Sequence, residues 1–259
     1  MALPSEQQRA VLVTGGARRI GAAIVRSLAE QGWMVFLHYN DAELEAHRLA
    51  EGLKHEGHHC VPVQADLQNP AEVETLIPRC LDIAGRLDCL VNNAARFVND
   101  NLDTVTWEGW QEHLAPNLTA PLFLAKHFAA ALPPGREGVI INMLDQKIYN
   151  LNPDFLSYTL SKVGLGGLTT ILAMHLAPQI RVCGIAPGVT LQSGKQTPES
   201  FARSQRATPL GRSTSIAEIV AAVHFILDSP SMTGSVITID GGEHLTRRPR
   251  DVAFDQDAE

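Results

Sequence analysis

Short apolar runs alternate with longer amphipathic segments along most of the chain. A short run rich in β-branched and aliphatic residues, bounded by glycine or polar residues, is typical of a strand buried on both faces of a sheet. Runs of this kind predict strands at residues 10–14, 33–37, 58–64, 87–91, 139–141, 180–185 and 235–239. Helical spacing of apolar residues predicts helices at about residues 22–31, 42–54, 72–84, 106–131, 155–177 and 215–227.

Strands that alternate with helices predict an α/β fold. We expect a single Rossmann-type, doubly wound parallel sheet of about seven strands with helices on both faces. No linker or second domain interrupts the pattern, so residues 1–259 are interpreted as one dinucleotide-binding and catalytic domain. Residues 1–8 and 249–259 are expected to be flexible tails. The polar stretch 190–210 is expected to be a mobile lid over a substrate.

Composition narrows the class of protein. A net charge of −7 argues against nucleic acid or an anionic membrane as the main partner. Residues 1–9 lack the apolar core of a signal peptide, and no apolar run is long enough to span a bilayer. The four cysteines show no metal-type spacing and are interpreted as reduced thiols. We therefore expect a cytoplasmic protein without a metal site.

The first predicted strand leads directly into a glycine-containing turn and a helix. The turn runs from Gly15 through Arg18, Arg19 and Ile20 to Gly21. Glycines let the backbone approach a pyrophosphate, and the helix N-terminus offers unpaired N–H groups to its charge. A plain strand-to-helix turn also favours glycine, but two adjacent arginines favour an anion-binding turn.

The end of the second strand bears on the choice of nucleotide. An enzyme that holds NAD usually places a carboxylate there to bind the ribose 2′-hydroxyl. Here His38, Tyr39 and Asn40 occupy that place, and the first acid is Asp41. With Arg18 available from the turn, this arrangement favours a 2′-phosphate and therefore NADPH. Asp41 itself is interpreted as the cap of the helix that follows.

A pair of residues in the fifth strand–helix unit suggests acid–base chemistry. Tyr158 and Lys162 are four residues apart, so on a helix they share one face. A neighbouring cation favours the phenolate and brings the tyrosine proton within reach of catalysis. The alternative is that the two side chains are ordinary neighbours on a helix surface. The carboxylate of Asp145 lies thirteen residues before Tyr158, just after the predicted strand.

Taken together, these features resemble the short-chain dehydrogenase/reductase family over roughly residues 8–248. The residues that carry the resemblance are Thr14, Gly15, Gly21, Asp66, Asn92, Asn93, Ala94, Asn117, Tyr158, Lys162, Pro187 and Gly188. The resemblance implies hydride transfer from a nicotinamide, with Tyr158 as proton donor. It implies that Lys162 holds the nicotinamide ribose and lowers the Tyr158 pKa, and that Asn117 anchors a water in the proton relay.

The cofactor-binding residues that these arguments predict come from several strand ends and from the catalytic helix. They are Gly15, Arg18, Arg19, Ile20, Gly21, His38, Tyr39, Asn40, Asp66, Leu67, Asn93, Ala94, Tyr158, Lys162, Pro187 and Gly188. Asp66 and Leu67 follow the third strand, where they could contact the edge of the cofactor's adenine ring.

Four departures from the family pattern are similar to its pteridine reductase branch, which reduces pterins and sometimes folates with NADPH. Arg19 replaces the middle glycine of the turn, Asp145 replaces a serine, and Ala95 replaces a glycine and is followed by Arg96-Phe97. The fourth is the closing sequence from Asp240 to Arg247. This resemblance implies a substrate site of Arg19, Ala95, Phe97, Asp145 and Tyr158. Phe97 would stack on the pterin, and Asp145 would join Tyr158 in proton delivery.

The carboxylate at position 145 favours a nitrogen heterocycle on chemical grounds as well. A carboxylate would repel a carbonyl oxyanion, whereas it suits ring nitrogens that need protons or N–H groups that need an acceptor. Asp145 could instead mark an inactive member or cap the next segment. Three functions stay open: a pterin reductase, a reductase of ketones or sugars, and an NADPH-binding sensor without activity.

Assembly can also be predicted from the catalytic helix. Its residues Leu160, Val163, Gly164, Gly167, Leu168 and Ile171 offer more apolar surface than one sheet face should cover. With the family resemblance, this pattern predicts a homotetramer. The alternative is a helix buried deeply within a monomer.

Overall fold

The chain forms one parallel seven-stranded sheet in the computed structural model, which describes residues 8–192 and 197–254. The spatial order of the strands is β3-β2-β1-β4-β5-β6-β7. Their bounds are β1 Ala10–Val13, β2 Met34–Tyr39, β3 Cys60–Gln64, β4 Cys89–Asn92, β5 Gly138–Met143, β6 Ile180–Pro187 and β7 Val236–Ile239. The predicted doubly wound α/β fold is confirmed.

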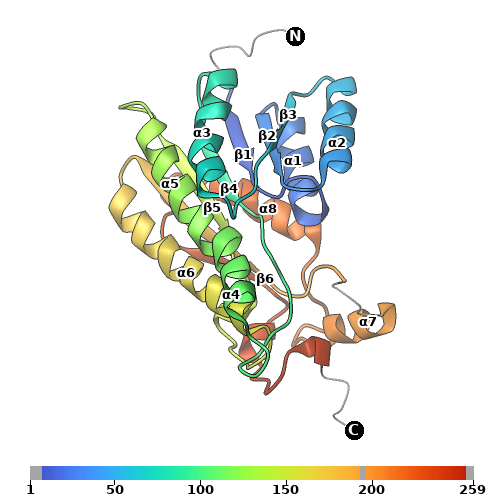
Figure 1. Cartoon of the computed structure of the whole chain (residues 1–259). Coiled ribbons are helices and arrows are strands. Elements are labelled where there is room, and N and C mark those ends of the chain that lie inside the picture. Colours follow the sequence, from blue (N-terminus) through green and yellow to red (C-terminus); the bar gives the residue numbers. More distant parts are fainter. Residues whose placement is uncertain (1–7, 193–196, 255–259) are drawn as a thin grey trace.

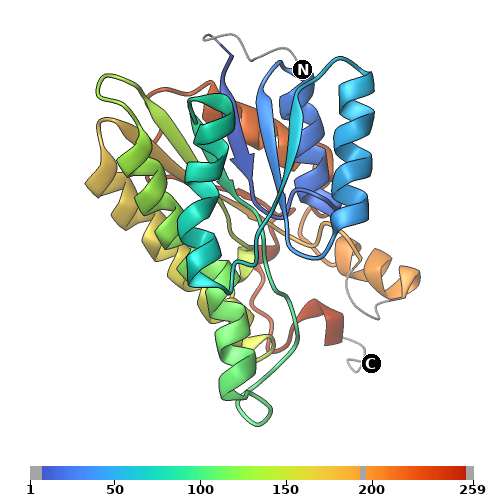
Figure 2. The same cartoon turned by 45° about the horizontal axis from the view of Figure 1, so that its top comes forward.

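Helices cover both faces of the sheet (Figures 1 and 2). On one face lie α1 Arg19–Glu30, α2 Glu43–His55 and α8 Ile216–Leu227. On the other lie α3 Pro70–Ala84, α5 Ala120–Ala131 and α6 Leu156–Leu176. Each layer encloses its own apolar core, because β1, β2 and β4 are fully buried and send alternate side chains to opposite faces.

Shorter elements gather beyond the carboxyl ends of the strands. They are the helices α4 Trp107–Leu114 and α7 Pro198–Arg206, and the 3₁₀ turns η2 Gln146–Ile148, η3 Glu243–Leu245 and η4 Val252–Phe254. Among the helices of the described ranges, none is both long and apolar enough to cross a membrane.

The long helix predicted at residues 106–131 contains a break that the pattern did not indicate. Between α4 and α5 the chain makes a π-helical turn, η1 Ala115–Thr119, which contains Pro116 and Asn117. A proline cannot donate an α-helical backbone hydrogen bond, and single π-turns inside α-helices occur frequently at functional sites. The turn brings the buried Asn117 side chain toward the N-terminal part of α6.

One smaller expectation is wrong. Asp41 does not cap α2, because Ala42 holds the N-cap position and no side chain caps the helix. Within the predicted lid the chain forms α7, and the side chain of its N-cap residue, Thr197, accepts a hydrogen bond from Ser200 N–H. That residues 190–210 act as a mobile lid stays a prediction. Residues 193–196 of this stretch lie outside the described part of the chain.

The carboxyl-terminal tail is shorter than expected, because residues 250–254 are bound to the body of the protein. Arg250 forms an ion pair with Asp154, with 2.8 Å between Nε and Oδ2. Phe254 stacks on Phe155, with ring centroids 5.7 Å apart. Residues 255–259 and residues 1–7 lie outside the described ranges.

The cysteines behave as the sequence indicated. All four are free thiols, and three of them, Cys80, Cys89 and Cys183, are buried. Burial raises the pKa of Cys60 and Cys80 to about 12. Thiols that stay protonated at neutral pH are poor nucleophiles and poor metal ligands.

Helix α2 offers a matched test of the packing. Leu53 is fully buried in the core beneath this helix, whereas Leu44 in its first turn is 67% exposed. Leu53→Ala should lower the free energy of unfolding by about 2–5 kcal/mol, because it leaves a cavity. Leu44→Ala should change it by less than about 0.5 kcal/mol. Urea unfolding followed by circular dichroism measures both; equal effects would show that α2 does not pack as described.

Candidate active site

A cleft of about 730 Å³ opens along the carboxyl ends of the strands. It lies where the strand order reverses between β1 and β4, which is the usual ligand site of an open α/β sheet. Every residue predicted to bind the cofactor or the substrate lines this cleft, and of the predicted catalytic residues only Asn117 does not.

The turn after β1 forms one end of the cleft, and its close packing requires glycine. A Cβ added to Gly21 would lie 2.1 Å from Gly15 O, and one added to Gly15 would lie 2.9 Å from Ala94 Cα. The Asn93 side chain fixes the turn by donating to Thr14 O and Gly15 O. At the start of α1 no side chain caps the helix and its first turn has no acid, so its N–H groups are available to an anion.

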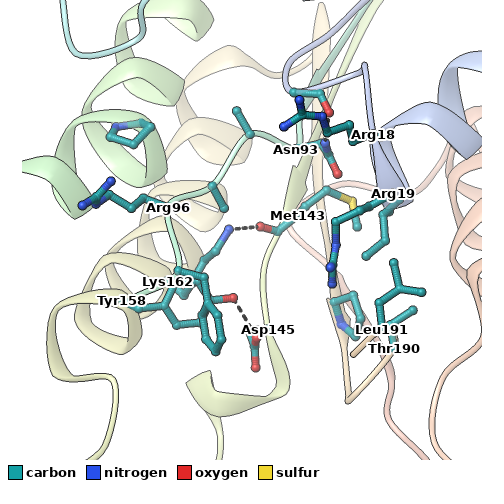
Figure 3. Close-up of a pocket in the computed structure, with 18 of the residues that line it drawn as sticks. Arg18, Arg19, Asn93, Arg96, Met143, Asp145, Tyr158, Lys162, Thr190 and Leu191 are labelled. Atoms are coloured by element: carbon teal, nitrogen blue, oxygen red, sulfur yellow. Dashed lines mark hydrogen bonds between the residues drawn. The ribbon is translucent and has the colours of Figure 1, made fainter. Parts of the chain in front are cut away.

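Arg19 occupies a conformation that glycine usually adopts. Its φ is 56°, in the left-handed region, which costs a non-glycine residue about 1–3 kcal/mol. The side chain extends towards Thr190 and Leu191, along the side of the cleft away from Tyr158 (Figure 3). There Nη1 donates to Gln192 O at 3.0 Å. The strained backbone therefore aims a cation over the cleft from the wall opposite Tyr158.

His38 supports the turn and carries no charge. Its Nδ1 accepts a hydrogen bond from Gly15 N–H at 3.0 Å, so the ring proton lies on Nε2, which donates to Ala65 O at 2.9 Å. Burial lowers the pKa of His38 to about 4, so the ring is neutral at physiological pH. His38 thus holds Gly15 in place, and it cannot supply positive charge to a phosphate.

The cation near the second strand end is Arg18. The Arg18 Nη2 atom lies 2.7 Å from Glu45 Oε1 of α2, with both side chains about half exposed. This pair uses two of the five guanidinium N–H groups, and the others are available to a ligand. Asn40 and Asp41 are also exposed at this edge of the cleft.

The start of α6 is fixed by a buried carboxylate that the sequence analysis missed. Asp100 accepts hydrogen bonds from the backbone N–H and the hydroxyl of Ser157. Phe155, just before the helix, has a φ of 54° and donates its N–H to Asn99 Oδ1. In the described ranges, Arg19 and Phe155 are the non-glycine residues with positive φ, and both adjoin the cleft.

Tyr158 and Asp145 form the central contact of the site. The tyrosine hydroxyl donates to Asp145 Oδ2 at 2.7 Å (Figure 3). The other carboxyl oxygen, Oδ1, caps η2 by accepting from Lys147 N–H at 2.9 Å. Asp145 therefore does cap the next segment, and it also contacts the candidate acid.

Burial raises the pKa of Asp145 above its usual range. Burial, and then the neighbouring carboxylate, also raise the pKa of Tyr158 well above its usual range. The expectation that Lys162 brings the Tyr158 pKa down is therefore not met in this structure. The phenol keeps its proton at neutral pH, and it can release that proton only to a strongly basic atom.

Lys162 lies beside the tyrosine on the same helix face, as the spacing predicts. Its ammonium lies 5.7 Å from the Tyr158 ring centroid and donates to Met143 O at 2.7 Å. Burial lowers the pKa of Lys162 to about 8. The side chain is thus a buried cation with donors left for a ligand hydroxyl.

Asn117 has its side chain fully committed to neighbouring protein groups. Its Nδ2 donates to Arg96 O and Ser161 Oγ, and its Oδ1 accepts from Arg96 N–H at 2.8 Å. It thereby holds the loop after β4 against α6. Its role in a water relay remains a prediction.

An aromatic group borders the substrate end. Phe97 stacks on Phe155 with ring centroids 4.3 Å apart and meets the Tyr158 ring edge at 4.6 Å. The Phe97 side chain is 40% exposed. Ala95 also lines this end, whereas Arg96 points away from Tyr158 and pairs with Glu112 (Figure 3).

Sequence reasoning also missed three charged residues that line the same end. Lys147 is 3% exposed and pairs with Asp251, with 2.6 Å between Nζ and Oδ2. Glu243 is 2% exposed. No spacing links Lys147 with Asp251, because the sheet and the carboxyl-terminal segment bring them together from 104 positions apart. The described residues contain no cluster suited to hold a metal.

Comparisons with known proteins agree with this geometry. A family model described as enoyl-(acyl carrier protein) reductase matches residues 15–244. Among solved structures, FolM alternative dihydrofolate reductase 1 from Brucella suis, in complex with NADP, superposes with a TM-score of 0.89. It is 41% identical, and the match covers 93% of this chain and 96% of that one.

Two curated relatives have different activities. Pteridine reductase 1 of Leishmania tarentolae is 33% identical over 278 residues, covering 91% of this chain and 96% of that protein. A probable galactose dehydrogenase of Rhizobium meliloti is 34% identical over 254 residues. That match covers 93% of this chain and 99% of that protein. With the matched sheet, glycine turn and Tyr-Lys pair, they show that the chain belongs to the short-chain dehydrogenase/reductase family of oxidoreductases.

Proposed function

We propose that this protein is an NADPH-dependent reductase of pterins, with dihydropterins and related folates as the substrate class. The observation that carries the proposal is the Tyr158–Asp145 hydrogen bond, which places a carboxylate where a carbonyl reductase needs a neutral donor. The similarity to a pteridine reductase and to an alternative dihydrofolate reductase supports it. We place the reaction in the cytoplasm, in keeping with four free thiols.

The cleft fits a dinucleotide in several respects. The uncapped start of α1 and the glycine turn suit the pyrophosphate, and the arginine at position 18 suits a 2′-phosphate. Lys162 is in place to hold the nicotinamide ribose. The structural neighbour from Brucella suis was crystallised with NADP, which supports the phosphorylated nucleotide.

Bound NADPH supplies the hydride that adds to the carbon of a C=N bond in the pterin. The adjoining nitrogen becomes strongly basic as the hydride arrives, and Tyr158 releases its hydroxyl proton to that nitrogen. The high pKa of Tyr158 keeps this proton in place until then. Asp145, in contact with the phenolate oxygen, then passes a proton from solvent to restore the hydroxyl.

A carbonyl reductase is the second candidate, because the relative from Rhizobium meliloti is a probable galactose dehydrogenase. A sugar or ketone would place its oxygen beside Tyr158, where the Asp145 carboxylate disfavours a developing oxyanion. An NADPH-binding sensor is the third. A buried phenol hydrogen-bonded to a carboxylate, with a buried ammonium beside the phenol ring, is unnecessary in a protein that only binds the nucleotide.

Arg18 should decide the choice of nucleotide. Arg18→Ala should lower kcat/KM for NADPH by about 10- to 100-fold, because a charged contact to the 2′-phosphate is lost. The kcat/KM for NADH should stay unchanged. Arg26→Ala is the matched control, since Arg26, in the helix α1 that follows Arg18, is also partly exposed and pairs with Glu56 at 2.9 Å. An equal loss with both nucleotides would contradict the assignment, and so would an NADH preference in the natural protein.

Asp145→Ser separates the pterin reductase from the carbonyl reductase. This substitution should lower kcat for a dihydropterin by about 10²–10⁴-fold, because a positioned acid–base group is lost. Reduction of an activated ketone should hold steady or rise, because serine supplies a neutral donor. Both rates are measured as NADPH oxidation at 340 nm.

Tyr158→Phe is the control for this comparison and should abolish both activities. The NADPH dissociation constant of Asp145→Ser should match that of the natural protein, because the glycine turn, the start of α1 and Arg18 would hold the nucleotide phosphates without this carboxylate. Unchanged pterin turnover in Asp145→Ser would contradict the proposal. If the natural protein reduced ketones but no pterin, the carbonyl reductase would replace it.

The proposed assembly is a homotetramer joined through α5 and α6. Several apolar side chains of these helices are exposed on the monomer: Leu122, Phe123, Leu160, Val163, Ile171 and Met174. Two of the small residues on α6 differ in their surroundings. Packing within the chain already requires glycine at position 164, since a Cβ on Gly164 would lie 2.9 Å from the Leu118 side chain. Gly167 faces open space, which leaves room for a neighbouring helix.

Light scattering at micromolar concentration should report four chains per particle. The double substitution Ile171→Lys and Met174→Lys should reduce that number, because it places charge in the proposed interface. Leu44→Lys, at an exposed leucine of α2, is the control and should leave the mass unchanged. A natural protein that elutes as a monomer would exclude the tetramer.

A further inference from the structure

Glu243 is a buried carboxyl group that the proton chemistry above does not use. It begins η3, directly after the glycines that follow β7, and lines the cleft together with Asp145 and Asp251. Its side chain is 2% exposed. The carboxyl group accepts a hydrogen bond from Val189 N–H, but within residues 8–192 and 197–254 its Oε2 atom has no partner.

The surroundings of this carboxyl group are unfavourable for it. Burial, and then the charges of Asp145 and Asp251, raise the pKa of Glu243 to about 7. The ammonium groups of Lys147 and Lys162, which line the same cleft, have other partners: Lys147 pairs with Asp251, and Lys162 donates to Met143 O. A buried acceptor without a donor destabilises the folded protein, so its presence needs an explanation.

A purely structural role does not supply that explanation. Glu243 supports its segment through backbone atoms: its carbonyl accepts from Thr246 N–H at 3.0 Å and from Asn150 Nδ2 at 3.4 Å. These contacts would persist with another side chain at position 243. What remains unsatisfied is one buried carboxyl oxygen of a residue that lines the cleft. The charge of Asp145, the hydrogen-bond partner of Tyr158, acts on this carboxyl group.

We propose that Glu243 is a specificity-determining residue, whose unpartnered Oε2 accepts a hydrogen bond from the 2-amino group of a pterin. The inference rests on the proposed function and deepens it, because it names the part of the substrate that the pocket selects. Asp145 and Tyr158 serve the ring nitrogen that gains a proton. Glu243 serves the 2-amino group, at the donor edge of the other ring.

This assignment explains why a carboxyl group stays buried without a donor. A pocket built to hydrogen-bond a substrate N–H strongly rejects an analogue that lacks it, because the buried acceptor is then left unpaired. A ketone or simple aldehyde offers no N–H group. Glu243 would therefore disfavour such compounds when they compete for the cleft, in addition to the effect of Asp145 on a carbonyl oxyanion.

The test pairs one substitution with one change in the substrate. Glu243→Gln keeps the size of the side chain but removes its charge. The two substrates are a 7,8-dihydropterin and its analogue with hydrogen in place of the 2-amino group. With the natural protein, kcat/KM should be at least 10-fold higher for the pterin. In Glu243→Gln the KM for the pterin should rise at least 10-fold, kcat should stay within about threefold, and most of the preference should disappear.

Two further variants separate recognition from folding. Glu243→Asp retains the carboxylate and should recover part of the preference for the pterin. Glu74→Gln, at an exposed position of α3 outside the cleft, should leave both kcat/KM values unchanged. The NADPH dissociation constant, measured by nucleotide fluorescence, should be the same in Glu243→Gln as in the natural protein, whereas general damage to the cleft would weaken it.

The outcomes distinguish a failure of the role proposed for Glu243 from a failure of the proposed pterin reductase function. If the natural protein reduces the pterin and Glu243→Gln keeps both its KM and its preference, the role of Glu243 is wrong and the proposed function stands. If the NADPH-bound natural protein reduces neither heterocycle, the proposed function fails, and the role of Glu243 fails with it.

Discussion

All strands of the sheet run in the same direction, and the position of the site follows from that constraint. Parallel pairing sends the carboxyl end of every strand to one edge, where residues far apart in the sequence meet. Gly15 after β1, Ala94 after β4, Asp145 after β5 and Gly188 after β6 all line one cleft for this reason. The helices bury the two faces and leave only this edge for chemistry.

Charge within the cleft is divided between its two ends. The nucleotide end has the open N-terminus of α1 and the guanidinium of Arg18. At the substrate end three carboxyl groups, those of Asp145, Glu243 and Asp251, gather beside the ammonium groups of Lys147 and Lys162. A dinucleotide phosphate and a neutral heterocycle with N–H donors match this division. An anionic substrate would be repelled by the carboxylates, unless its charge extended outward to the exposed arginine at position 19.

The fold could be predicted almost completely from the sequence, because strands buried on both faces leave a strong apolar signal. The nucleotide end was also predictable, since it lies in three short local motifs that begin at Gly15, His38 and Asn92. The role of His38 was not, because only the folded chain shows its ring bonded between Gly15 and Ala65. Burial lowers the pKa of His38, so the ring is neutral and serves to hold the backbone at Gly15 in place.

The substrate end was harder to predict. Tyr158, Lys162 and Asp145 follow from spacing within one strand–helix unit, but Lys147 meets Asp251 only through tertiary packing. The π-turn at Asn117 left no periodic signal either, because one extra residue in a turn hardly changes a helical pattern. In the sequence, Glu243 is only one residue of the closing stretch from Asp240 to Arg247. Its burial, on which the proposed role depends, is not indicated by any local pattern.

The strained backbone at Arg19 and the unpartnered carboxyl group of Glu243 bear on any effort to engineer this protein. Both lower the stability of the free protein, so a screen for heat resistance would select glycine at the first position and an apolar residue at the second. Variants obtained in this way would have lost two residues that line the cleft. Thermostability is better sought in the helical layers, away from the carboxyl edge of the sheet.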